Sequence, residues 1–347
     1  MRRCPIAIIG DRFMKPEAFT EALTSVLGEG LDLRTLELAW PDEPMRHGYV
    51  DEGLPGLREY LGDPDAIVDF VAGAEVLVNH LAPVTGAMLD RLPGLRLIAV
   101  ARGGPVNIDL AACRARGVKV ANTPGRNASA VAEFTIGAIL AETRLIRAGH
   151  EALRQGVWRG DLYRADVTGT ELSELTVGII GYGQIGTRVV RLLKPFGCAV
   201  LVCDPYKTLS PEDVADGVRM VDLDTLLASS DVVSLHARVT EETRGFLAAP
   251  QFARMKRGAY FINTARGPMV DYDDLYAALR DRHLRGAMLE TFWLEPPPPD
   301  APLLRLDNVT LTPHIAGAST TTVRIAARMA AEEVRRHLAG EPPAHPC

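Results

Sequence analysis

Three charged or titratable side chains in the second half of the chain each follow a short apolar run. They are Arg266 in FINTARGPMVD, Glu295 in LETFWLEPPPP and His314 in LTPHIAG. Histidine exchanges protons near neutral pH, and a neighbouring carboxylate would stabilise its charged form and fix its tautomer. An arginine can hold a carboxylate or polarise a carbonyl oxygen. These residue types together could support hydride transfer at an alcohol or ketone.

Each of these residues also has a structural interpretation when it is considered alone. Arg266 could form a salt bridge at a sheet end, Glu295 could be a loop charge, and His314 could cap a strand. Pro313 should end the last apolar run, so that His314 would face a cleft between two domains. We therefore expect catalysis only if the surrounding elements bring the three side chains to one edge.

A glycine motif, Gly181-x-Gly183-x-x-Gly186, follows the apolar run LTVGII and precedes a helical pattern. Here glycines permit a tight turn, close approach of the backbone to a pyrophosphate and close helix packing. The next apolar run ends in Asp204, roughly 20 residues further on, where a carboxylate would bind a ribose diol and repel a 2′-phosphate. The motif predicts a dinucleotide site that favours NAD over NADP.

Short apolar runs alternate with helical patterns along most of the chain, which favours parallel sheets covered on both faces. The expected strands of the first half are 6–10, 33–38, 75–80, 95–101 and 118–122, with helices around 17–27, 66–72, 86–92 and 110–116. The expected strands of the second half are 175–181, 199–204, 231–237, 258–265, 286–292 and 308–314. The pattern predicts an α/β protein with two Rossmann-like domains.

Two helical segments shape the expected domain organisation. A long helical stretch follows Pro124-Gly125, with Val131, Phe134 and Ile146 among its apolar positions. The last helix, 319–338, should pack back on the first domain. We therefore predict a discontinuous, flavodoxin-like substrate domain from residues 1–121 plus 315–347. A doubly wound NAD-binding domain should occupy 122–314, and the polar insertion 41–62 has no predicted role.

Composition limits the classes of partner and the compartment. The 347 residues are 47% hydrophobic and 24% charged, with a formal net charge of −6, which gives no reason to expect nucleic acid. No window has the length of a membrane span, and the first apolar run stops at Asp11, too early for a secretory signal. Five scattered cysteines without metal-ligand spacing favour a reducing cytoplasm and no metal site.

These motifs together resemble the D-isomer-specific 2-hydroxyacid dehydrogenase family. The resemblance covers nearly the whole chain, because NTPGRNASAVAEFTIG, GIIGYGQIG, SLHARVTEETRG, INTARGPMVD, LETFWLEP and TPHIAG follow the order and spacing of the family. It implies that Arg266 binds the substrate carboxylate and carbonyl oxygen, that His314 donates and accepts the proton, and that Glu295 hydrogen-bonds His314. It also implies a homodimer.

The resemblance assigns further residues to the cofactor. Gln184 and Ile185 match positions that approach the pyrophosphate, and Thr264 and Ala265 match positions beside the nicotinamide. Glu290 stands where the family usually has an aspartate that contacts the nicotinamide carboxamide. We expect all five residues to line an NAD site.

The first half of the chain supplies the expected substrate contacts. The amides of Gly103 and Gly104 match the loop that holds the substrate carboxylate, and His80 is a further candidate contact. Arg102 precedes the two glycines. It is expected to be a surface residue or part of an interdomain ion pair, or else to point inward and bind a distal phosphate or the distal hydroxyls of a sugar acid.

Three functions are compatible with these residues. The first is an NAD-dependent dehydrogenase or reductase of a D-2-hydroxy acid. The second is an NAD-sensing interaction protein like the transcriptional corepressors of the same fold, which keep the catalytic residues. The third is a short form of phosphoglycerate dehydrogenase, since the chain has no room for an added regulatory domain. Turnover of 2-oxo acids would separate the first two.

Overall fold

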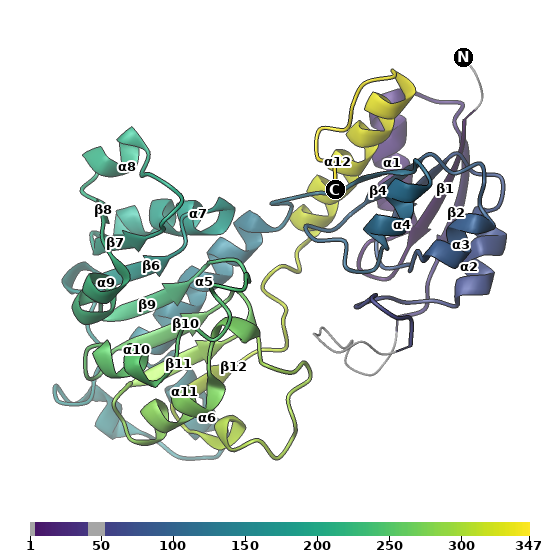
Figure 1. Cartoon of the computed structure of the whole chain (residues 1–347). Coiled ribbons are helices and arrows are strands. Elements are labelled where there is room, and N and C mark those ends of the chain that lie inside the picture. Colours follow the sequence, from purple (N-terminus) through teal and green to yellow (C-terminus); the bar gives the residue numbers. More distant parts are fainter. Residues whose placement is uncertain (1–3, 41–52) are drawn as a thin grey trace. The chain divides into compact units, whose positions relative to one another are not determined.

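The computed structural model describes residues 4–40 and 53–347, so most of the predicted insertion 41–62 lies outside the described residues. The chain divides into two compact units, which are coloured along the sequence in Figure 1. Unit 1 comprises Met1–Asn127 and Ala318–Cys347, and unit 2 comprises Ala128–Gly317.

Unit 1 contains a five-stranded sheet in which every pair of neighbours is parallel, in the order β2-β1-β3-β4-β5. This is the flavodoxin-like order, as predicted. The central strands are almost entirely inaccessible to solvent, which explains why they read as continuous apolar runs. The strands are β1 (Pro5–Gly10), β2 (Asp32–Glu37), β3 (Val76–Asn79), β4 (Leu97–Val100) and β5 (Lys119–Ala121).

Helices cover both faces of this sheet and enclose two separate apolar cores. One face carries α1 (Pro16–Leu27) and α12 (Thr320–Leu338), and α12 packs its alanines against α1 and β4. The hydroxyl of Ser319 accepts the Thr322 amide at 3.0 Å and caps α12. The other face carries α2 (Pro64–Val71), α3 (Gly86–Asp90) and α4 (Leu110–Ala115).

Unit 2 contains a seven-stranded parallel sheet in the order β12-β11-β10-β9-β6-β7-β8. The strand order reverses beside β6, where an open α/β sheet has its ligand-binding switch point. The two residues of β8 are exposed, so this strand lacks the apolar run by which the others were predicted. The strands are β6 (Thr176–Ile180), β7 (Ala199–Cys203), β8 (Arg219–Met220), β9 (Val232–Leu235), β10 (Tyr260–Asn263), β11 (Gly286–Leu289) and β12 (Val309–Leu311).

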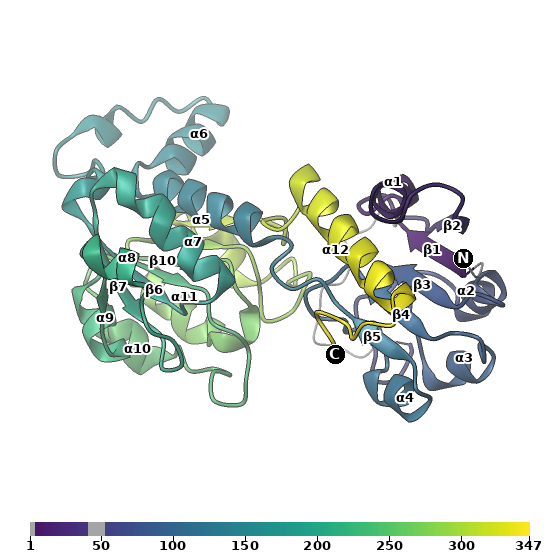
Figure 2. The same cartoon turned by 90° about the horizontal axis from the view of Figure 1, so that it is seen from above.

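Helices also cover both faces of the second sheet. One face carries α5 (Ala128–Thr143) and α7 (Gln184–Leu193), which lie side by side in Figure 2. The other face carries α9 (Leu223–Ser229), α10 (Ala249–Arg254) and α11 (Tyr272–Arg280). The remaining helices of this unit are α6 (Ile146–Arg154), α8 (Pro211–Ala215), η1 (Gly160–Tyr163), η2 (Leu172–Glu174), η3 (Lys194–Phe196), η4 (Gly267–Met269) and η5 (Pro302–Arg305). The predicted fold class is confirmed in both units.

The long helical stretch predicted after Pro124-Gly125 is two helices rather than one. Leu145 has a left-handed backbone, with φ of 56°, and this conformation ends α5 before α6 begins. The apolar spacing continued to Ile146, but that side chain is 59% exposed and does not belong to the buried face of α5. No helix in the described part of the chain combines the length and apolar content that a membrane crossing requires.

Candidate active site

The carboxyl edge of the unit 2 sheet gathers the residues predicted for cofactor and catalysis. Ligands bind at this edge in open α/β sheets, because the turns after parallel strands meet there. The residues follow five of its strands: Gly181 follows β6, Asp204 follows β7, Thr264 to Arg266 follow β10, Glu290 follows β11, and His314 follows β12.

His314 and Glu295 are in direct contact. The Nδ1 atom of His314 lies 2.8 Å from Oε2 of Glu295, whose side chain is only 8% exposed. The other carboxylate oxygen of Glu295 accepts the Phe292 amide at 2.9 Å, so the carboxylate is held from two sides. A carboxylate at Nδ1 favours the tautomer that carries its proton on that nitrogen.

His314 also has a left-handed backbone, with φ of 55°. This conformation is uncommon for a residue with a side chain, and it persists where surrounding contacts hold the backbone in place. The neighbouring carboxylate of Glu290 supplies such contacts, because it accepts the Thr312 hydroxyl and the Ala316 amide. The His314 amide donates to the Glu290 carbonyl at 3.2 Å. Burial raises the pKa of Glu290 above its ordinary value.

The loop that carries Arg266 contacts the loop before Glu295. A Cβ atom on Gly267 would lie 1.7 Å from the Phe292 carbonyl oxygen, so only glycine permits this approach. The hydroxyl of Tyr272 donates to the Thr291 carbonyl and joins the same two segments. The Arg266 side chain is exposed, and its Nη1 donates to the Ala265 carbonyl at 2.7 Å. Arg266, Glu295 and His314 therefore belong to one connected framework.

The glycine motif has the geometry of a dinucleotide-binding loop. Gly181 has φ of 98°, and a Cβ atom there would lie 2.7 Å from the Ala237 nitrogen. A Cβ on Gly183 would meet no heavy atom within 4 Å in the described part of the chain, which leaves room for a phosphate group at the start of α7. Gln184 and Ile185 form the first turn of this helix.

Asp204 is oriented by two backbone amides. Its Oδ2 accepts the Tyr182 amide at 2.7 Å, and its Oδ1 accepts the Tyr206 amide at 2.9 Å. A carboxylate fixed beside the glycine loop is suited to accept hydrogen bonds from a ribose diol. These residues fit a bound NAD.

Several supporting residues were not identified from the sequence. Thr135 on α5 lies 2.9 Å from the Thr264 hydroxyl, and Asn263 holds the Ala265 amide at 3.0 Å. Thr312 was also missed, although it lies two residues before His314. Hydroxyl and amide side chains of this kind carry no motif, because their partners are set by packing rather than by sequence spacing.

Unit 1 contains the predicted substrate contacts. The amides of Gly103 and Gly104 donate no hydrogen bond within residues 4–40 and 53–347, so both remain able to bind a carboxylate. Arg102 forms an ion pair with Glu59 of the same unit. The His80 side chain is 5% exposed, and its Nδ1 lies 2.6 Å from Oδ2 of Asp11.

Comparisons with known proteins agree with this geometry. Residues 136–316 match the family described as D-isomer specific 2-hydroxyacid dehydrogenase, NAD binding domain. The chain is 39% identical over 260 residues to a glyoxylate reductase from Thermofilum pendens (strain DSM 2475 / Hrk 5), covering 75% of this chain and 77% of that relative. It is 36% identical over 267 residues to a D-3-phosphoglycerate dehydrogenase from Archaeoglobus fulgidus, covering 77% of this chain and 50% of the relative.

A solved structure extends the similarity to the whole fold. The D-lactate dehydrogenase from Escherichia coli superimposes with a TM-score of 0.75 at 25% sequence identity. The match covers 98% of this chain and 99% of the other.

Proposed function

Because the chain belongs to the D-isomer specific 2-hydroxyacid dehydrogenase family, we propose that Arg266, Glu295 and His314 carry its catalytic chemistry. The chain is an NAD-dependent oxidoreductase that interconverts a D-2-hydroxy acid and its 2-oxo acid. The observation that carries the catalytic proposal is the 2.8 Å contact between His314 and Glu295, on the same sheet edge as the glycine loop.

Each residue has a distinct task in this proposal. Bound NAD accepts or supplies a hydride at the C2 carbon of the substrate. Nε2 of His314 takes the hydroxyl proton during oxidation and returns it during reduction. Glu295 stabilises the imidazolium and fixes its tautomer through Nδ1. The Arg266 guanidinium binds the substrate carboxylate and polarises the carbonyl oxygen.

Other residues complete the proposed site. The amides of Gly103 and Gly104 bind the substrate carboxylate. Gln184 and Ile185 lie beside the pyrophosphate, Thr264 and Ala265 lie beside the nicotinamide, and Asp204 selects NAD over NADP through the ribose.

The proposal is tested by following NADH absorbance with a panel of small 2-oxo acids, with and without a phosphate group. We expect His314→Gln to retain NADH binding and to lose about 10²- to 10⁴-fold in the reduction rate, the usual contribution of a positioned general acid. A near-normal rate in this variant would exclude the assignment of His314. A wild-type protein that binds NADH but reduces no 2-oxo acid would instead favour an interaction protein.

Two further features of the protein are part of the proposal. Exposed apolar side chains on and after α6, including Trp158 and Tyr163, support a homodimer. Cys113, Cys198, Cys203 and Cys347 are free cysteines in the described part of the chain, which fits the cytoplasm as the compartment.

A further inference from the structure

The carboxyl edge of the unit 1 sheet carries a second cluster of charged groups. Asp11 follows β1, His80 follows β3, Arg102 follows β4 and Arg126 follows β5. These four strands are neighbours in the sheet, and the turns after parallel strands are where α/β folds bind ligands. The cluster therefore lies at the edge of the unit 1 sheet where α/β folds bind ligands.

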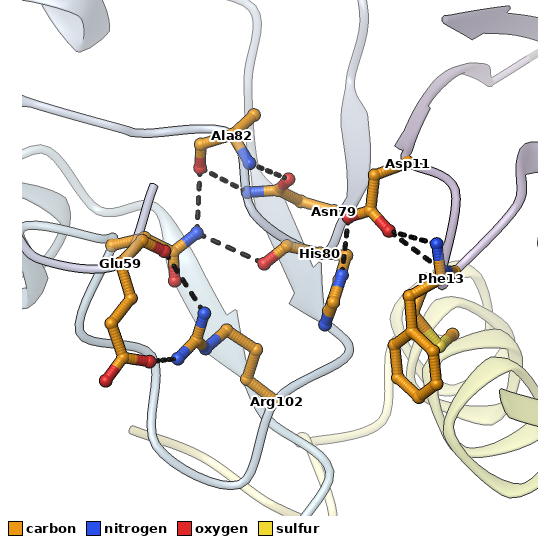
Figure 3. Close-up of polar contacts among 9 residues, drawn as sticks. Asp11, Phe13, Glu59, Asn79, His80, Ala82 and Arg102 are labelled. Carbon is orange, nitrogen blue, oxygen red and sulfur yellow. Dashed lines mark hydrogen bonds and ion pairs between the residues drawn. The ribbon is translucent and has the colours of Figure 1, made fainter. Parts of the chain in front are cut away.

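The guanidinium of Arg102 is hydrogen-bonded to Glu59. Nη2 of Arg102 donates to the Glu59 carboxylate and Nη1 donates to the Glu59 carbonyl at 3.2 Å, as Figure 3 shows. The side chains are 13% and 21% exposed, so water screens this pair only weakly. Glu59 has φ of 51°, an uncommon backbone conformation for a residue with a side chain.

The segment around Glu59 is bonded to the loops of the cluster on both sides. The Arg58 amide donates to the Val106 carbonyl at 2.9 Å, and the Leu61 amide donates to the Leu81 carbonyl at 3.0 Å. The backbone on both sides of Glu59 is thus fixed to this sheet edge, and it holds the Glu59 carboxylate there.

Asp11 and His80 form the opposite side of the cluster. Asp11 accepts the Phe13 and Met14 amides at 2.9 and 2.8 Å, in addition to its contact with His80. Burial lowers the pKa of His80 to about 4, so the imidazole is neutral at neutral pH. His80 therefore offers a hydrogen-bonding group without adding a positive charge.

One donor atom of the Arg126 side chain has no hydrogen-bond partner among the described residues. Its guanidinium carbon lies 6.0 Å from the centre of the Phe13 ring, and burial lowers its pKa to about 10, which keeps it charged at neutral pH. Neither its buried Nη1 nor the buried hydroxyl of Thr123 has a hydrogen-bond partner among the described residues. Buried polar groups are normally paired with protein or with water, so these two groups are available to a polar ligand.

We propose that this cluster binds the uncharged, hydroxyl-bearing end of a sugar acid, and that Glu59 excludes substrates whose far end is anionic. The two arginines are balanced by two carboxylates, Asp11 and Glu59, so the cluster has hydrogen-bonding capacity but no excess positive charge. This inference rests on the proposed function, because it takes Gly103 and Gly104 as the loop that holds the C1 carboxylate.

The balance of charge in the cluster determines whether it favours a hydroxyl or a phosphate group of the substrate. A phosphate would be attracted by Arg102 and Arg126 but would meet the Glu59 carboxylate, and two like charges in close contact disfavour binding strongly. The several hydroxyls of a sugar acid can donate to Glu59 and accept from Arg126, so together they can satisfy both groups. Removal of the Glu59 charge should therefore shift the preference of the site from a hydroxyl toward a phosphate group.

The test compares three substrates with the same four-carbon chain: (R)-2-hydroxybutyrate, D-erythronate and 4-phospho-D-erythronate. The kcat/KM of each is measured from NADH formation with the wild-type protein and with Glu59→Gln. We expect the wild type to prefer D-erythronate to both other acids by at least about tenfold, the effect of a hydrogen bond to a charged group. Glu59→Gln should raise the ratio of phosphorylated to unphosphorylated erythronate by at least about tenfold.

Glu29→Gln is the matched control, since Glu29 is an exposed carboxylate of unit 1 and its loss changes the net charge equally. Its substrate ratios should equal those of the wild type. A wild type that prefers the phosphorylated acid, or a Glu59→Gln variant with unchanged ratios, would overturn the inference. The wild-type ranking decides the question even if the variant does not fold. Absence of turnover with every 2-hydroxy and 2-oxo acid would instead overturn the proposed function.

Discussion

Glu290 has hydrogen-bond partners that its expected role at the cofactor does not include. The family resemblance places it beside the nicotinamide, and its two carboxylate oxygens also accept the Thr312 hydroxyl and the Ala316 amide. Both partners lie two residues from His314. Glu290 can therefore act as a positioning residue for the general acid, through the backbone that carries it.

The variant Glu290→Asp distinguishes the two roles. Its shorter side chain withdraws the carboxylate from the His314 loop, and a displacement near 1 Å can lower a rate about 10²-fold. We expect kcat to fall by about 10- to 100-fold while the KM for NADH stays within about twofold. Glu290→Gln keeps the length of the side chain and should lose less. A large rise in the KM for NADH with normal kcat would place Glu290 against the cofactor instead.

Asp204 controls the choice of cofactor in the proposed site. Because its oxygens also hold the Tyr182 and Tyr206 amides, Asp204→Asn is a better test than removal of the side chain. The amide keeps an acceptor but loses the charge that repels a 2′-phosphate. We expect the ratio of kcat/KM for NADPH to that for NADH to rise roughly tenfold. Equal use of both cofactors by the wild type would contradict the role of Asp204.

The residues of the site could be predicted from the sequence, but most of their hydrogen-bond and ion-pair partners could not. Arg266, Glu295 and His314 stand at the ends of apolar runs, so strand topology alone brings them to one edge. The pairing of Arg102 with Glu59 could not be predicted, because 43 positions separate them and only the folded chain brings them together. The ion pair expected for Arg102 was interdomain, whereas the observed partner, Glu59, lies within unit 1.

At the scale of elements, burial explains why most strands could be predicted, and an unusual backbone conformation explains why the end of α5 could not. Strands such as β1 and β9 are buried on both faces and therefore read as uninterrupted apolar runs. The end of α5 could not be predicted, because Leu145 adopts a left-handed backbone that leucine rarely takes. Neither a glycine nor a proline marks that position.

His236, directly after β9, makes the stability of unit 2 sensitive to acid. Burial lowers its pKa from 6.5 to about 3, and its Nε2 lies 2.8 Å from the Ser234 hydroxyl. Between these two pH values the unfolded chain binds a proton that the folded chain does not, so stability falls as the pH falls. The loss from one such group approaches about 1.4 kcal/mol per pH unit.

Urea unfolding of the wild type and of His236→Asn, at about pH 7 and about pH 5.5, measures this contribution. We expect the variant to lose about 1 kcal/mol less than the wild type between the two pH values. His150→Asn is the control, because His150 is exposed and its replacement should leave the pH dependence unchanged. Parallel behaviour of the wild type and His236→Asn would mean that burial does not lower the pKa of His236 in the folded protein.

At the scale of the whole molecule, each unit has one sheet edge to which the proposals assign a ligand. The unit 2 edge carries the dinucleotide loop and the pair of His314 and Glu295. The unit 1 edge carries Gly103, Gly104 and the charged cluster that ends at Glu59. Both edges are the carboxyl ends of parallel strands. The rule that ligands bind at this end of an open α/β sheet therefore applies to each unit.

The apolar surface on and after α6 is the feature that points beyond the single chain. It includes Ile146, Leu153, Trp158 and Tyr163, which are 59%, 57%, 83% and 95% exposed. Large apolar side chains exposed to water are unfavourable, and several of them in one segment commonly mark a protein interface. A second copy of this chain is the partner that the homodimer proposal assigns to it.

Substitution of charged residues into this surface tests the dimer. Trp158→Asp and Tyr163→Asp together should shift the protein from dimer to monomer, because aromatic side chains contribute most of the binding energy in such interfaces and a buried carboxylate opposes association. Light scattering after size-exclusion chromatography gives the mass directly. Val214→Asp is the matched control, since Val214 is 57% exposed on α8, outside this surface. A wild type that is monomeric, or a double variant that remains dimeric, would show that α6 is not the interface.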